Sequence, residues 1–168
     1  MRVYIPATFD MLSALAEERS VPARGGWGFA VTPALLEFYT SGDEEEIAHL
    51  AFQDAARASL RLLATGEQDR FPHRRVVISA DIDDGSVEVS PESGESVVRL
   101  DPPRVDLADI VCFHVDIAGS EAATAAAVEV VDAADLGDED AELTVGDALD
   151  NFMAWYEVQE LDALVQLL

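Results

Sequence analysis

Short apolar runs typical of buried strands alternate along this chain with longer segments of helical period. The runs 75–82 and 109–117 are rich in β-branched residues and indicate central strands, and shorter candidates lie at 2–5, 29–31 and 97–100. This alternation predicts an α/β (or α+β) fold, a single-domain sandwich over residues 1–168 with helices packed on a mixed β-sheet. With 49% hydrophobic residues in 168, the chain has enough material for one such core.

Capping residues place the predicted helices. Thr8 and Thr32 each precede a segment of helical period, and a proline follows Thr32 at the first helical position. Asp43 and Glu46 have the spacing of a capping box, and they begin the longest predicted helix, which ends just before Gly66. We therefore expect three helices in the first 66 residues.

The remaining segments carry weaker signals. The sequence predicts a glycine-rich loop at 20–28, turns at 83–96 with an edge strand near 87–89, an alanine-rich helix at 120–134, an acidic connection at about 135–142, and a C-terminal strand (152–158) followed by a short helix. The last strand competes with a helix, because Phe152, Met153, Trp155 and Tyr156 are too dense for an exposed helix face.

Acidic residues dominate the charge and gather in the second half. The chain has 34 acidic and 10 basic residues, a formal net charge of -24. Residues 1–84 carry 14 acids and 8 arginines (net -6), whereas residues 85–168 carry 20 acids and 2 arginines (net -18). Binding to phosphates needs cations, so direct contact with nucleic acid is disfavoured. An acidic surface can attract a basic protein partner, or it can serve only solubility.

The expected location is the cytoplasm. The first residues lack the apolar region of a signal peptide, and no apolar run approaches the ~18 residues that span a bilayer. The single cysteine, Cys112, cannot form an intramolecular disulfide and fits a reducing compartment. We therefore expect a soluble protein without membrane contact.

A candidate site follows from the strand ends. If the strands are parallel, their carboxyl ends share one edge and bring together the side chains of Thr8, Thr32, Asp81, Asp83 and Asp116. The two threonines mark helix starts, where an anion could bind, although capping alone explains them. His114 lies two residues before Asp116 on the same face, so Asp81, His114 and Asp116 are candidate acid–base residues. A structural, hydrogen-bonded histidine is the competing interpretation.

Arg57 and Arg61 are the second candidate. They are four apart on the longest predicted helix, near Asp54, and could present a fork to a carboxylate or phosphate ligand. Salt bridges on the flank of the helix explain the same spacing.

Motifs for metals, nucleotides and acyl transfer are missing or defective. The stretch from Asp81 resembles a calcium loop, but Gly85 stands where a ligand is needed and Ser86 where the turn glycine is needed. The chain has no G-x-G-x-x-G fingerprint, no P-loop lysine and no G-x-S-x-G elbow. We therefore expect no metal site and no cofactor.

Seven blocks of sequence carry a family resemblance. The strings MRVYIPAT, GFAVTPAL, DAARASLRLL, RRVVISAD, HVD, ADLGDEDAE and WYEVQEL occur in this order. Together they resemble an uncharacterised family of small actinobacterial proteins, a domain of unknown function, from residue 1 to about 164. Members of this family typically have a proline where this chain has Asp162. The resemblance implies a bacterial cytosolic protein and supplies no activity, ligand or catalytic residue.

Two functional hypotheses remain, beside a third in which the acidic surface mimics DNA. The first is a non-enzymatic protein that acts through protein–protein contacts on the acidic second half. The alternative is a small-molecule-binding protein or enzyme, with its site at strand ends near Thr8, Thr32, Asp81, His114 and Asp116.

Overall fold

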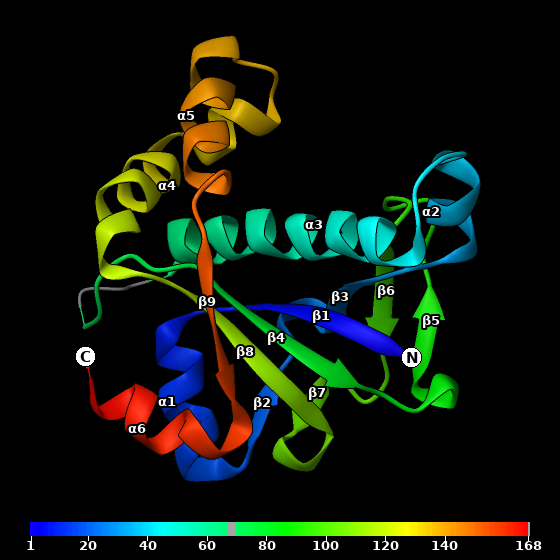
Figure 1. Ribbon diagram of the computed structural model, residues 1–168, viewed down its shortest axis with the longest axis horizontal. Coiled ribbons are helices and arrows are strands. Elements are labelled where there is room, and N and C mark those ends of the chain that lie inside the picture. Colours follow the sequence, from blue (N-terminus) through cyan, green and yellow to red (C-terminus); the bar gives the residue numbers. More distant parts are fainter. Residues whose placement is uncertain (67–69, 168) are drawn as a thin grey trace.

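A seven-stranded sheet forms the centre of the molecule. The computed structural model describes residues 1–66 and 70–167, and in this part of the chain the strand order is β5-β6-β3-β1-β4-β8-β9 (Figure 1). A separate two-stranded sheet pairs β2 with β7. The strands are β1 (Arg2–Ala7), β2 (Ser20–Pro22), β3 (Trp27–Ala30), β4 (Val76–Asp81), β5 (Val87–Val89), β6 (Val97–Leu100), β7 (Arg104–Asp106), β8 (Ile110–Asp116) and β9 (Met153–Glu157).

The predicted fold class is confirmed, as one α/β unit with helices on a sheet. The strand directions differ from expectation. Each strand pair within the described residues is antiparallel, rather than part of a mixed sheet. Runs of β-branched residues indicate buried strands but carry no direction, so the sequence could not distinguish the two arrangements.

Helices cover both faces of the sheet. The apolar side chains of Val3, Ile5, Ile78 and Phe113 point to one face and pack with α1 (Phe9–Glu18) and α6 (Leu161–Gln166). The long helix α3 (Glu44–Thr65) lies across the other face (Figure 1). Alternation along each strand produces this division, because successive side chains point to opposite sides. The main core therefore lies between the sheet and α1, and a smaller one lies under α3.

Local capping signals account for the helix starts in the first half. The Thr8 and Thr32 hydroxyls accept hydrogen bonds from the backbone N–H of Met11 and Leu35, at the starts of α1 and α2 (Pro33–Phe38). Asp43 and Glu46 form the predicted reciprocal capping box of α3. Each cap satisfies donors that a helix start leaves unpaired, so these short motifs encode their helices directly.

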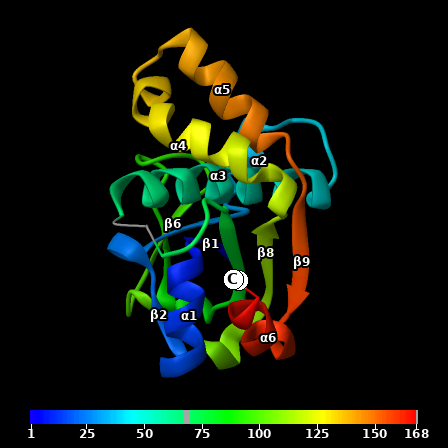
Figure 2. The ribbon, with the colours of Figure 1, turned by 90° about the vertical axis from the view of Figure 1, so that its left-hand side faces the viewer.

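A helical hairpin extends away from the sheet. α4 (Glu121–Asp135) and α5 (Glu139–Leu149) pack against each other and against Leu60 of α3, and the hairpin projects above α3 in Figures 1 and 2. The acidic connection predicted at 135–142 is thus wrong in its second half. Asp138 caps α5 by accepting from the backbone N–H of Ala141. Dense acidic residues here form the first turn of a helix, where they suit the helix dipole.

One further segment differs from the sequence prediction, and the C-terminal segment confirms it. The glycine-rich segment 20–28 is not simply a loop, because it contains β2, which pairs with β7, and the start of β3. The C-terminal strand and short helix are confirmed as β9 and α6, with a 3-10 turn between them. Other 3-10 turns lie at Arg24–Gly26, Asp84–Ser86, Leu107–Asp109 and Ala118–Ser120.

None of the described helices combines the length and apolar character needed to cross a membrane.

Candidate functional site

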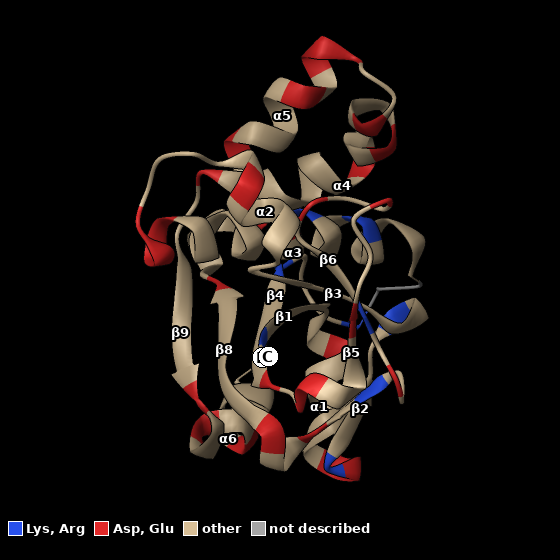
Figure 3. Cartoon of the chain, turned by 90° about the vertical axis from the view of Figure 1, so that its right-hand side faces the viewer, with Lys and Arg blue, Asp and Glu red and all other residues tan. Residues whose placement is uncertain are grey.

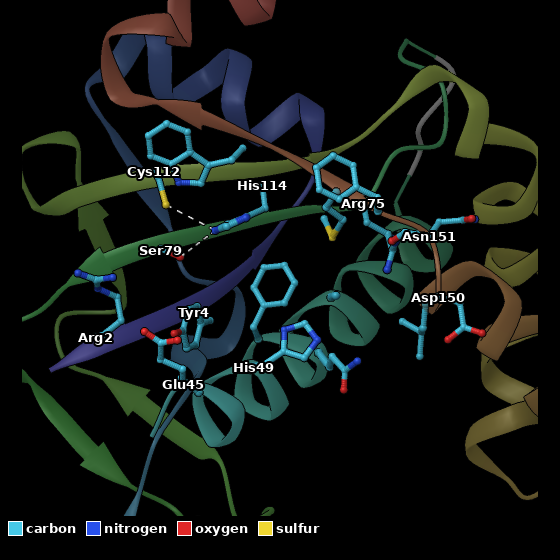
Figure 4. Close-up of a pocket in the computed structure, with 18 residues that line it drawn as sticks. Arg2, Tyr4, Glu45, His49, Arg75, Ser79, Cys112, His114, Asp150 and Asn151 are labelled. Carbon is cyan, nitrogen blue, oxygen red and sulfur yellow. Dashed lines mark hydrogen bonds between the residues drawn. The ribbon is translucent and has the colours of Figure 1, made fainter. Parts of the chain in front are cut away.

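A cavity of about 780 Å³ lies between α3 and the central strands (Figure 4). The sheet forms its floor with alternate residues of four adjacent strands: Arg2 and Tyr4 from β1, Ser79 from β4, Cys112 and His114 from β8, and Met153 and Trp155 from β9. These side chains share one face because the antiparallel register aligns their positions across the sheet, with His114 opposite Trp155.

One face of α3 forms the opposite wall. The lining residues recur three or four positions apart, which is the spacing of a single helix face, and they are Glu45, Ala48, His49, Phe52, Gln53 and Ala56. The two alanines have short side chains and leave room between helix and sheet. The connection from α5 to β9, residues 150–152, borders one end of the cavity together with Leu149.

His114 is the polar centre of the floor. Its Nε2 atom lies 3.4 Å from Ser79 Oγ and 3.5 Å from Cys112 Sγ. The contact with Ser79 is long for a good hydrogen bond and the thiol of Cys112 is only a weak partner, so this nitrogen retains capacity for a ligand. Burial lowers the pKa of His114 below its usual value, which keeps the ring neutral at physiological pH. A neutral imidazole can donate or accept a hydrogen bond, depending on its tautomer.

Aromatic rings form the walls and rim. Phe52 contacts Tyr4 edge-on at 6.0 Å between centroids, His114 at 4.7 Å, and His49 in a stacked arrangement at 5.8 Å. At the rim, Trp155 is 54% exposed and Phe152 is 70% exposed. Large apolar side chains grouped at the mouth of a cavity are typical of binding sites, whereas isolated ones need no explanation.

Ion pairs neutralise both arginines of the lining. Arg2 Nε lies 2.7 Å from Asp81 Oδ1, and this bond raises the pKa of Arg2 and lowers the pKa of Asp81. Arg75 Nη2 lies 2.7 Å from Asp116 Oδ1, with both side chains at least 99% buried. By contrast, the lining carboxylates of Glu45 and Asp150 have exposed side chains and no ion-pair partner within residues 1–66 and 70–167.

The structure separates the residues that the parallel-strand hypothesis grouped together. In the antiparallel sheet, Thr8 and Asp116 lie at one edge, and Thr32 and Asp81 lie at the other. Of these four and His114, only His114 lines the cavity. Thr8 and Thr32 cap helices, Asp81 pairs with Arg2, and Asp116 is buried against Arg75 and Thr124. Asp83 is exposed and precedes a 3-10 turn.

Arg57 and Arg61 join α3 to the helical hairpin. Arg57 Nη1 lies 2.7 Å from Glu142 Oε1 and its Nη2 lies 3.1 Å from Asp135 Oδ1, while Arg61 Nε lies 2.6 Å from Asp135 Oδ2. These bonds raise the pKa of Arg57 and lower the pKa values of Asp135 and Glu142. The fork predicted for an anionic ligand thus holds carboxylates of the chain itself.

The cavity contains residues that the sequence did not single out, among them Tyr4, Phe52, Ser79 and Trp155. A usable signal exists: Ser79 and His114 interrupt otherwise apolar strands, and the aromatic residues at 152–156 are dense. No local sequence motif indicates which helix packs against these strands, because tertiary packing decides it. Across the described residues, no group of three or more His, Cys, Asp or Glu side chains is placed to hold a metal ion.

Comparison with protein families confirms the uncharacterised family that the sequence predicted. The family described as "Family of unknown function (DUF6912)" matches residues 1–165. Comparisons with curated proteins and with solved structures give no match.

Proposed function

Because the chain belongs to this family of unknown function, which supplies no activity to transfer, we propose from the cavity itself that the protein binds a small organic molecule with an aromatic or other apolar group. The binding is non-catalytic in this proposal. The ligand lies between α3 and the sheet, with its apolar part against Phe52 and Trp155 and a polar atom facing His114.

The observation that carries this proposal is the combination of volume and lining in one cavity. About 780 Å³ is within the range of small-molecule sites, and such sites typically combine apolar walls with a few convergent polar groups. Here the convergent groups are Ser79, Cys112 and His114, which meet at the His114 Nε2 atom. A bound ligand would cover the rings of Phe152 and Trp155 at the rim, which explains why these large apolar side chains are exposed in the free protein.

Chemical-shift mapping with neutral aromatic fragments, such as benzyl alcohol and indole, tests the proposal. We expect shifts grouped at residues of the cavity, around His114 and Phe52. Ala48→Trp fills the cavity from α3 and should abolish these shifts. Ala126→Trp, at an exposed position of α4 outside the cavity, is the matched control and should leave them unchanged. Shifts that are scattered over the surface, or that persist in Ala48→Trp, would refute the proposal.

The helical hairpin supports a second candidate function, binding of a basic protein. Figure 3 shows acidic residues along the hairpin. The exposed ones include Glu129, Asp132, Glu139, Asp140 and Asp147, and they occur with two leucines, Leu136 and Leu143, that are 90% and 70% exposed. Apolar side chains beside carboxylates favour a partner that offers lysine or arginine around an apolar contact. The same negative potential repels phosphates, so the proposed partner is a protein and not a nucleic acid.

Binding of a lysine-rich amphipathic peptide, measured against salt, tests this second candidate. The triple variant Asp132→Asn/Glu139→Gln/Asp140→Asn should weaken binding, and it spares Asp138 and Glu142, which have structural bonds. Glu17→Gln/Glu18→Gln/Glu37→Gln makes the same charge change at exposed sites of the first half. If the two triple variants behave alike, the protein shows only general charge attraction and the hairpin is not the site.

We also propose that the protein acts in the cytoplasm of a bacterium, in line with the actinobacterial resemblance of its sequence blocks. The single cysteine, Cys112, is buried and free, which suits a reducing compartment. Fractionation of the source cells tests this location, and recovery of the protein outside the cytosolic fraction would contradict it.

A further inference from the structure

We infer that the chemical group recognised in this cavity is an organic ammonium ion, which contacts aromatic rings and is attracted by the carboxylates of Glu45 and Asp150 at the two ends of the cavity. This inference rests on the proposed ligand-binding function and specifies its ligand class.

The charges around the cavity favour a cation. The two lining arginines are each paired with a carboxylate, Arg2 with Asp81 and Arg75 with Asp116. Glu45 and Asp150 add two negative charges that no ion pair within the described residues compensates, and Figure 4 shows them at opposite ends of the cavity. The chain as a whole has a net charge of -24, so its field also attracts cations.

The aromatic lining supplies the second requirement. A cation within about 6 Å of a ring face is attracted by the quadrupole of the ring, and tryptophan provides the strongest attraction. Trp155 on β9 and Phe52 on α3 line the cavity from the sheet and from the helix, so a ligand in the cavity has an aromatic ring on either side. An alkylated ammonium group also covers the apolar surface that Phe152 leaves exposed at the rim.

His114 is compatible with this ligand class. A protonated imidazole would repel a cation, but burial lowers the pKa of His114 and keeps it neutral at physiological pH. In the tautomer with its proton on Nδ1, Nε2 accepts a hydrogen bond and could take one from the N–H of a protonated amine.

Calorimetric titration with three one-ring probes of different charge tests the inference: benzyltrimethylammonium, benzyl alcohol and phenylacetate. The titrations use the variant Trp27→Phe, in which Trp155 is the only tryptophan. The fluorescence of Trp155 then reports whether each probe reaches the cavity. We expect the cation to bind about tenfold more tightly than the alcohol, and the anion to bind most weakly. The variant Glu45→Gln/Asp150→Asn should lower the affinity for the cation by about fivefold, and it should not lower the affinity for the other two probes.

Glu17→Gln/Glu18→Gln is the matched control for charge, because both residues are exposed on α1 and do not line the cavity. This control should change cation affinity less than the cavity variant does. Equal affinity for the alcohol and the cation would overturn the ammonium inference and leave the binding function intact. If none of the three probes changes Trp155 fluorescence or releases heat, both the inference and the proposed function fail.

A peptide containing one trimethyllysine distinguishes the two sources of the ammonium group. If it binds more tightly than benzyltrimethylammonium, the group belongs to a protein side chain. If it binds more weakly, the group belongs to a free small molecule. Both outcomes require that the Glu45→Gln/Asp150→Asn variant loses affinity for the peptide, and an unchanged affinity would contradict the inference.

Discussion

At the residue scale, the buried pair Arg75–Asp116 connects three elements. Asp116 accepts hydrogen bonds from the Arg75 side chain, from the Arg75 backbone N–H and from Thr124 Oγ1 of α4, and Arg75 also donates to the carbonyl of Asn151. The pair therefore ties the start of β4, where Arg75 directly precedes the strand, to β8 and α4 at the end of the cavity. Desolvation makes such a pair a weak source of net stability, but it makes the loss of one partner costly.

We predict that Asp116→Ala lowers the free energy of unfolding by about 3–5 kcal/mol, because it leaves the Arg75 guanidinium buried without its carboxylate. Urea denaturation measures this loss. Asp81→Ala is the control, since its pair with Arg2 is exposed and should contribute less than about 1 kcal/mol. Similar losses in the two variants would show that burial of the Arg75–Asp116 pair has little energetic effect.

The half-buried His114 predicts a pH dependence of stability. Burial holds its folded pKa below the ordinary value of 6.5, so the unfolded chain takes up the proton first as the pH falls. The contribution of His114 is therefore fully present above about pH 6.5 and is lost as the pH falls through its folded pKa. Urea denaturation between about pH 8 and about pH 5.5 measures this loss in wild type and in His114→Gln.

The difference between wild type and His114→Gln isolates this residue, because carboxylates such as Asp81 titrate in both proteins. His73→Gln changes a histidine that does not line the cavity and should retain the wild-type profile. A wild-type profile parallel to that of His114→Gln over the whole range would contradict the prediction.

At the element scale, four charged side chains fasten the helical hairpin to α3. Arg57 and Arg61 reach Asp135 and Glu142 across the interface, beside the apolar contacts of Leu60. We predict that Arg57→Met increases amide hydrogen exchange in α4 and α5 more than in the sheet, with a global cost of about 1 kcal/mol. Exchange followed by mass spectrometry measures the difference between these elements. Arg70→Met, whose contact with Asp10 is 3.8 Å and exposed, should leave the hairpin unchanged.

The same scale shows which elements the sequence encodes locally. Helices with a side-chain cap in a short motif, at Thr8, Thr32 and Asp43, were predicted close to their true starts. α5 was missed because its buried positions are the small residues Ala141, Val145 and Ala148, set among acidic residues that suggested a loop. Its cap at Asp138 was present in the sequence, but the weak apolar face did not reveal the helix.

At the scale of the whole molecule, the candidate site depends on facts that no single segment contains. The histidine of the floor was identified, but its expected neighbour Asp81 follows from a parallel sheet that the chain does not form. Asp116, two residues along the same strand, is buried against Arg75 and does not line the cavity. Ser79 joins His114 because β4 and β8 are antiparallel, and Phe52 joins it because α3 crosses this face. Strand direction and helix placement are decided by packing over the whole chain, so the sequence could indicate one site residue but not the site.

The net charge of -24 leads to a prediction about the whole molecule. With 34 acids against 10 arginines, repulsion among carboxylates outweighs the few exposed ion pairs. At 0.1 M salt, interactions between exposed charges more than about 10 Å apart are largely screened, so raising NaCl from about 0.02 M to about 0.5 M should increase the free energy of unfolding by about 1 kcal/mol. Urea is the suitable denaturant for this measurement, because it does not itself screen charge.

The neutralised variant Asp132→Asn/Glu139→Gln/Asp140→Asn should respond less to salt than wild type, and sucrose at matched osmolality should not reproduce the difference between them. A stability that falls with salt would mean that the ion pairs of Arg57, Arg61 and Arg74 outweigh the general repulsion. The sign of the response therefore decides whether the acidic surface opposes folding, in which case a cationic partner or ligand would stabilise the protein by neutralising it.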